Sequence, residues 1–144
     1  GIDVNQRDNQ KATLLRAASE KAGDEITQIL LDAGADPDIQ DTEGCTPLLF
    51  ALHKRRYSTM RVLLRNGASP NVTDNDGYSA LHACAIEDDA EATKLLLRES
   101  KADVDMLSHD KHDPVTPLFI AVHENHLKTA EIMLRGGAKC EISN

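Results

Sequence analysis

The sequence predicts an all-α solenoid of repeated helix-turn-helix units, and two regularities predict it. A six-residue motif occurs at intervals of 33, 33 and 37 residues, as TLLRAA from Thr13, TPLLFA from Thr46, SALHAC from Ser79 and TPLFIA from Thr116. An apolar run of three residues begins 16 residues after each motif start. Units of this period bury their apolar faces only against one another, so they are expected to stack side by side.

The first helix of each unit begins at the motif. Thr46 and Thr116 are placed to cap their helices through the hydroxyl group, and Pro47 and Pro117 occupy the first helical position, where a missing N–H costs nothing. We expect the leucines and the small residues that recur in the motif to face the core. They are Leu15, Leu48, Leu81 and Leu118, and Ala18, Ala51, Cys84 and Ala121.

The second helix of each unit contains the apolar run and is followed by a turn. Gly34, Gly67 and Gly137 fit the left-handed residue that commonly terminates a helix. The third unit has the irregular segment 100–103 at this place. A polar loop then leads to the next motif, so each unit is predicted to be helix, turn, helix and long loop.

These features together resemble the ankyrin repeat, whose 33-residue unit has a T-P-L-H-x-A signature and a G-A-D-x-N loop. The resemblance covers almost the whole chain and implies one domain over residues 1–144, with loops that form β-hairpin fingers. Because neither end has the polar face of a dedicated cap, we expect a segment of a longer array. Residues 1–5 match the tail of a preceding repeat, and the repeats occupy approximately residues 8–40, 41–73, 74–110 and 111–144.

His82 keeps the histidine of that signature. The resemblance implies that this side chain hydrogen-bonds the backbone of a neighbouring loop, in line with the need of a buried polar group for a partner. The alternative role of a general base lacks a nearby nucleophile. The chain has no G-x-S-x-G elbow, Gly-rich phosphate loop or H-E-x-x-H motif, and Cys84 lies at the small packing position, so we predict that the protein is not an enzyme.

The composition predicts a soluble intracellular module, and the resemblance implies that it binds another protein. A net charge of −8 argues against nucleic-acid binding, which rests on basic side chains. There is no signal peptide, and no apolar run approaches the roughly 18 residues of a membrane span. Three cysteines without disulfide or zinc spacing favour a reducing compartment, cytosol or nucleus. We expect a protein or peptide partner, without membrane insertion, small-molecule substrate or cofactor.

Clusters of opposite charge lie one repeat apart. The second repeat contains the basic residues 53–56, Arg61 and Arg65, and the third contains the acidic residues 87–89 and Glu91. Helices of adjacent repeats pack about 8–10 Å apart, so the clusters are expected to attract one another, each exposed pair contributing at most about 1 kcal/mol. Two alternatives stay open: the basic cluster docks an acidic partner segment, or it contacts phosphate or nucleic acid.

The candidate partner-binding residues lie on the fingers and first helices, which line the concave face that the resemblance implies. Tyr78 is the strongest anchor because it lies in a finger beside Gly77, where the signature makes no demand. Phe50 and Ile120 are equally well interpreted as core residues. The set comprises Thr42, Glu43, Cys45, Phe50, His53, Lys54, Asn75, Asp76, Tyr78, Ile86, Glu87, His112, His123 and Glu124.

The interval before Thr116 contains four residues more than the others. One extra residue falls in the turn, and the rest lengthen the finger. Insertions in repeat proteins map to loops on one face, often the binding face, so this finger either contacts a partner or is a tolerated surface insertion. A third interpretation, metal binding by His109, His112, Asp110 and Asp113, lacks cysteine support and a fixed set of surrounding partners.

Two functions therefore follow from the sequence. The first is an interaction module that binds a partner along the concave face. The second is a regulatory or targeting array within a larger enzyme, channel or transcription regulator, where the same surface packs intramolecularly. A purely structural spacer is disfavoured by the lengthened finger. The fold indicates the mode of action and not the identity of the partner.

Overall fold

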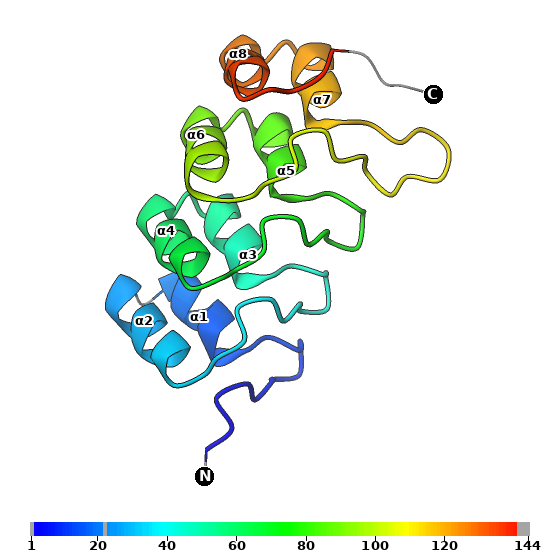
Figure 1. Cartoon of the computed structure of the whole chain (residues 1–144). Helices are drawn as coiled ribbons and strands as arrows, with labels where there is room; N and C mark the ends of the chain where they lie inside the picture. Colours follow the sequence, from blue (N-terminus) through cyan, green and yellow to red (C-terminus); the bar gives the residue numbers. More distant parts are fainter. Residues whose placement is uncertain (1, 22, 141–144) are drawn as a thin grey trace.

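The computed structural model describes residues 2–21 and 23–140, and these contain eight α-helices. They are α1 (Leu14–Lys21), α2 (Asp24–Asp32), α3 (Pro47–His53), α4 (Tyr57–Arg65), α5 (Ala80–Glu87), α6 (Ala90–Glu99), α7 (Pro117–His123) and α8 (Leu127–Arg135). Figure 1 shows them stacked pairwise, in chain order, into a solenoid. The odd-numbered helices form the inner row beside the long loops, and the even-numbered helices form the outer row.

The helix boundaries follow the predicted capping chemistry. The hydroxyl oxygens of Thr46 and Thr116 accept from the backbone N–H groups three residues on, at 3.3 and 3.2 Å, and a proline begins each of these two helices. Gly34, Gly67 and Gly137 have φ angles of 91°, 90° and 96°, which confirms the predicted left-handed turns. Ser100 is extended instead, with φ −143°, so α6 ends without such a turn.

A continuous core of aliphatic and small side chains runs through the stack. The predicted leucines at positions 15, 48, 81 and 118 are buried, as are the predicted small residues at 18, 51, 84 and 121. Met60, Leu63, Leu96 and Met133 bring the outer helices into the same core. Small residues let neighbouring helices approach closely, and this explains why so few aromatic side chains suffice to fill the core.

The fingers are turns without strands. They comprise residues 8–12, 41–45, 74–78 and 108–115, and in each the backbone N–H of the first residue donates to the carbonyl of the last, at 2.9 to 3.0 Å. In the described part of the chain the only β-type pairing is an isolated bridge between Arg7 and Thr13. The implied β-hairpins are therefore reduced to one closing bond per finger, because each finger is too short to extend a ladder.

The fingers are linked to one another through their backbones. Thr42 N–H donates to the Gln10 carbonyl at 3.0 Å, and Asn75 N–H donates to the Glu43 carbonyl at 3.1 Å. His109 N–H continues the series to the Gly77 carbonyl at 3.3 Å. These bonds hold the fingers at the same spacing as the helix pairs.

The fourth finger contains most of the insertion. Its closing bond joins Ser108 to Val115, whereas that of the third finger joins Asp74 to Tyr78. Three extra residues therefore lie inside the finger, and the remaining one precedes Ser108, as the sequence predicts. The Ser108 hydroxyl accepts from Val115 N–H at 3.1 Å and strengthens the base of this longer loop.

His82 connects the third repeat to the fourth finger. The side chain is fully buried, Ser79 N–H donates to its Nδ1 at 3.2 Å, and its Nε2–H donates to the Val115 carbonyl at 2.9 Å. Burial lowers its pKa, so the imidazole stays neutral and can serve as acceptor and donor at once. This confirms the structural role predicted for His82.

The end tails repeat the internal turn contacts where the structure describes them. The Asn5 side-chain oxygen accepts from Asp36 N–H at 2.8 Å, just as Asp38 accepts from Ser69 N–H at 2.9 Å one repeat later. Gly1 and Glu141, which belong to the two predicted tails, lie outside the described residues.

We predict that alanine at Gly44 destabilises the protein more than alanine at Gly67. Both glycines are left-handed, with φ 81° and 90°, so each substitution incurs a backbone cost of about 1 kcal/mol. A Cβ at Gly44 would lie 2.5 Å from the backbone N of Asn75, whereas one at Gly67 would meet nothing within 4 Å. Urea unfolding should therefore show an additional loss of about 1–3 kcal/mol for Gly44→Ala. Equal losses for the two variants would contradict the close approach of the fingers.

Candidate partner-binding site

A hollow of about 540 Å³ lies between the second and third fingers and the inner helices α1 and α3. It brings together seven of the residues predicted from sequence and three that were not predicted. The predicted lining residues are Thr42, Glu43, Cys45, Phe50, His53, Asn75 and Asp76, and the additional ones are Arg16, Asp41 and Asp74.

Phe50 forms the aromatic wall of this hollow. The Arg16 guanidinium lies over its ring, 4.1 Å from the centroid, and the Lys54 ammonium lies 5.6 Å from it. The half-buried ring is not among the side chains that form the core cluster. Of the two interpretations of Phe50, the structure therefore does not support a core residue: the ring is partly exposed, and cations lie over its face.

Arg16 is the main residue that sequence reasoning missed. Its Nε lies 3.4 Å from Oδ2 of Asp41 but makes no hydrogen bond, although the atom is buried. Arg16 occupies the place of the signature histidine in the first repeat, where His82 stands in the third. The charge of Arg16 at this signature position could have revealed it from the sequence. Its side chain turns toward Asp41 of the neighbouring repeat.

The hollow is negatively charged. Four carboxylates line it against one guanidinium, that of Arg16. Asp41 and Asp74 each accept two backbone N–H groups of their own finger, whereas Glu43 and Asp76 are exposed and form no ion pair within residues 2–21 and 23–140.

The negative charge of the hollow affects the pKa of the Cys45 thiol. Burial raises the pKa of its thiol to about 11, with further contributions from the carboxylates of Asp41, Asp74 and Glu43. The thiol therefore stays protonated near neutral pH and has little nucleophilic character. Cys84 is fully buried in α5, and burial likewise raises its pKa. The three cysteines are free thiols.

Asn75, His53 and Glu87 are engaged within the protein. The Asn75 side-chain amide donates to the Thr42 carbonyl at 2.8 Å and so joins two fingers. His53 Nδ1 pairs with the Glu87 carboxylate of the next repeat. These side chains shape the hollow and support its walls.

The basic cluster of the second repeat forms ion pairs with the third repeat, with Asp89 of the predicted acidic cluster and with Glu99, which lies outside it. Arg55 lies 3.6 Å from Asp89, and Arg61 and Arg65 lie 3.2 and 3.8 Å from Glu99. Of the three interpretations of the basic cluster, the structure favours attraction between repeats. Glu91 departs from the pattern, because it pairs with Lys94 of its own helix at 3.5 Å.

The remaining predicted residues lie outside the hollow. The Tyr78 ring packs against the His82 imidazole, with 5.7 Å between the ring centroids. Tyr78 therefore makes a contact within its own repeat. Ile86 is 46% exposed on α5, and Ile120 packs against the core. His123 lies 3.0 Å from Glu124 on the exposed end of α7, and His112 is exposed in the fourth finger, where its N–H donates to Asp110.

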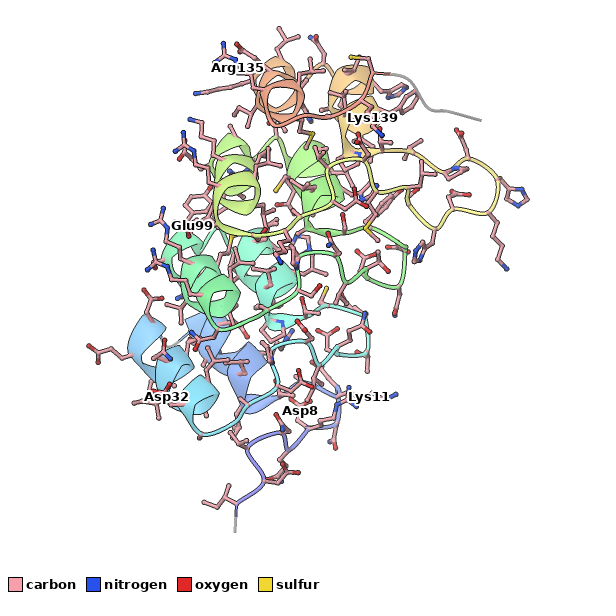
Figure 2. All side chains as sticks on the ribbon, in the orientation of Figure 1. Asp8, Lys11, Asp32, Glu99, Arg135 and Lys139 are labelled. Atoms are coloured by element: carbon pink, nitrogen blue, oxygen red, sulfur yellow. The ribbon has the colours of Figure 1, made fainter. Side chains whose placement is uncertain are left out.

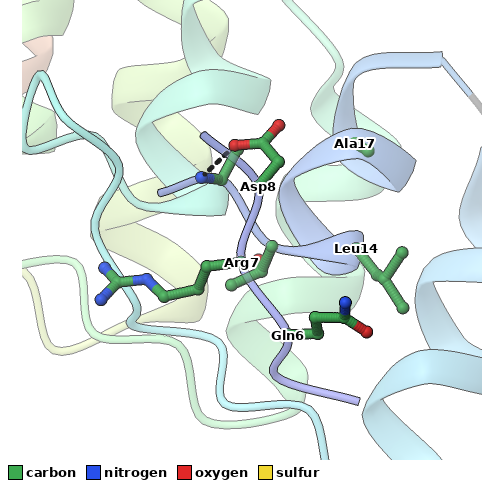
Figure 3. A pocket seen from close by; sticks show the side chains of 7 residues that line it. Gln6, Arg7, Asp8, Leu14 and Ala17 are labelled. Atoms are coloured by element: carbon green, nitrogen blue, oxygen red, sulfur yellow. Dashed lines mark hydrogen bonds between the residues drawn. The ribbon is translucent and has the colours of Figure 1, made fainter. Parts of the chain in front are cut away.

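A smaller hollow of about 280 Å³ lies beside the first finger (Figure 3). Gln6, Arg7, Asp8, Leu14 and Ala17 are among the residues that line it. The Asp8 carboxylate accepts from Ala12 N–H at 2.9 Å, and Arg7 donates to the backbone carbonyls of Lys11 and Gln40. These contacts organise the finger, and none of the predicted site residues lies there.

The described residues contain neither a candidate metal-binding cluster nor a candidate membrane-spanning helix. Among them, no group of three or more His, Cys, Asp or Glu side chains is arranged to hold a metal ion. None of their helices combines the length and the apolar character that crossing a bilayer requires.

Comparison with known families agrees with this geometry. A family model described as ankyrin repeats, in three copies, matches residues 14–108 and residues 62–144. The two matches overlap and together extend over all four described helix pairs. No curated protein matches the chain.

We predict that the three cysteines react with a thiol reagent in a fixed order. Cys140 is exposed and should react first, and Cys45 should react slowly because its raised pKa leaves little thiolate. Cys84 should react only on unfolding. In a Cys140→Ser variant the Cys45 rate should increase about tenfold per pH unit between pH 7.5 and 9.5, because the thiolate fraction grows tenfold per unit below the pKa. A rate for Cys45 that levels off near pH 8.5 would contradict the raised pKa.

Proposed function

Because this chain belongs to the ankyrin-repeat family, whose members generally act as protein-interaction modules, we propose that it binds a partner protein or peptide in the hollow between its second and third fingers. The observation that carries the proposal is Phe50, a large side chain held in the hollow and apart from the core cluster. Interface energy concentrates in such anchors when the surrounding polar groups exclude water.

The charge of the hollow supports a partner with a cationic side chain. Glu43 and Asp76 have no partner of opposite charge among the described residues, and they are exposed finger residues that line the same hollow as Phe50. A lysine or arginine of the partner could pair with them while an adjacent apolar group meets the ring. Complementary charge of this kind also speeds association and makes binding sensitive to salt.

We predict that peptides selected from a random library on the 144-residue chain bind at Phe50. Phe50→Ala should weaken them at least tenfold, because the anchor is lost, and Glu43→Lys with Asp76→Lys should do the same by charge reversal. Glu25→Lys is the matched control, since Glu25 is exposed in the first turn of the outer helix α2. Isothermal titration calorimetry measures affinity, and thermal melting verifies folding. Peptides that bind all four proteins equally would refute this placement.

A second candidate function is the regulatory array that packs against another part of a larger protein. One observation favours it: Phe119, Val122 and Leu134 are 49%, 63% and 45% exposed and line a hollow of about 250 Å³ with Cys140. Exposed apolar patches of this kind mark surfaces that another protein covers. In this function the repeats also bind a protein surface, but that surface belongs to the same polypeptide.

We predict that Cys140 distinguishes the two functions. In the isolated 144-residue chain the exposed thiol should react rapidly. In any longer polypeptide that contains this chain and packs against the α7–α8 face, the same thiol should be protected at least tenfold, because it lines the apolar hollow. Equal reaction rates in the two contexts would contradict intramolecular packing at this face.

A further inference from the structure

The outer helices α4 and α6 carry cations at two equivalent positions, and α8 carries one at the second of them. Arg61 and Arg65 on α4 lie 33 residues before Lys94 and Arg98 on α6, and Arg135 on α8 lies 37 residues after Arg98. At the junction of α4 and α6, the Glu99 carboxylate accepts Arg61 at 3.2 Å and Arg65 at 3.8 Å. One carboxylate of the next repeat thus faces both cations of α4.

At the junction of α6 and α8 this carboxylate is missing. The residue equivalent to Glu99, 37 positions later, is Gly136. Its φ of −79° is accessible to any residue, so backbone conformation does not require glycine. A Cβ there would lie 2.7 Å from Cδ1 of Leu97, so the end of that flexible side chain would have to shift to admit one. The α4–α6 junction also has a hollow, of about 330 Å³, but Glu91 and Glu99 are among its lining residues. The α6–α8 junction has Gly136 in place of such a carboxylate.

The hollow at the α6–α8 junction has only cationic charge. It has a volume of about 300 Å³, with Leu97 and Ile132 as its apolar lining, and its charged lining residues are Lys94, Arg98 and Arg135. No carboxylate lines it, although the chain as a whole has a net charge of −8.

The ion pairs that these cations form within the protein do not cancel the positive charge of the hollow. Lys94 lies 3.5 Å from Glu91 and Arg135 lies 2.6 Å from Glu131, both on the same helix and both well exposed, so these pairs are weak and screened. Arg98 forms no ion pair within the residues that the structure describes. Figure 2 places Arg135 and Glu99 on the outer-helix side, away from Asp8 and Lys11 on the finger side.

We propose that the hollow between α6 and α8 is a second docking site, which takes an acidic segment of a partner protein. A glutamate or aspartate carboxylate of that segment lies between Lys94, Arg98 and Arg135, where it supplies the charge that Glu99 supplies one repeat earlier. A neighbouring apolar side chain of the segment packs on Leu97 and Ile132. Charge-assisted hydrogen bonds from guanidinium groups to a carboxylate are among the stronger polar contacts in proteins. This site is separate from the concave hollow at Phe50 and does not depend on it.

The test uses the 144-residue chain and a fluorescein-labelled peptide of alternating glutamate and leucine. Fluorescence anisotropy should show saturable binding that weakens at least fivefold between 20 and 150 mM NaCl. Arg98→Ala should weaken binding at least fivefold and leave the melting temperature unchanged, since Arg98 has no ion pair to lose among the described residues. Gly136→Glu should weaken it at least tenfold, because it places a carboxylate in the hollow.

Controls and mapping decide the outcome. Lys21→Ala removes one positive charge at the exposed end of α1 and should leave the affinity within twofold. Amide NMR shifts should concentrate at Leu97, Arg98 and Gly136. The proposal is overturned if the glutamate peptide does not bind, or if Arg98→Ala and Lys21→Ala have the same affinity for it. It is also overturned if the NMR shifts lie in the fingers, or if only a phosphoserine peptide without glutamate binds. If Gly136→Glu unfolds the protein, the Arg98→Ala comparison still decides.

Discussion

The burial of each helix pair against its neighbours is the constraint on which the rest of the structure depends. Leu48, Leu52 and Leu63 of the pair α3 and α4 are fully buried in the stack, where this pair packs against the helix pairs on both sides. This requirement sets the distance between repeats. The finger-to-finger hydrogen bonds and the inter-repeat ion pairs then form at that distance, because equivalent groups recur at a constant spacing.

Both candidate binding surfaces arise at junctions between repeats. The concave hollow combines Arg16 of the first repeat with Phe50 of the second and Asp76 of the third finger. The outer hollow exists because Gly136 of one repeat faces Leu97 of another. At the α4–α6 junction, the Glu99 carboxylate lies opposite Arg61 and Arg65. Departures from the repeat pattern are therefore the places where the surface retains unused charge or an uncovered ring.

Local chemistry explains which features the sequence could predict. The caps at Thr46 and Thr116, the glycine turns and the lengthened finger depend on a few adjacent residues, and each was predicted correctly. Seven of the ten residues that line the hollow were among the predicted candidates, because the whole lining belongs to fingers and inner helices. Arg16 over Phe50, and Tyr78 against His82, depend on side-chain directions relative to other groups in the fold, which spacing alone does not determine.

In the fourth finger, a longer loop does not change the spacing between the stacked repeats. Its link to the third finger, from His109 N–H to the Gly77 carbonyl, lies at its base, and so does the bond between Ser108 and Val115. Residues 110–114 extend beyond both bonds and are exposed. Foreign segments grafted between these anchor points would thus be displayed beside the concave surface without changing the register of the helices, which makes this loop a natural insertion point for engineering new recognition.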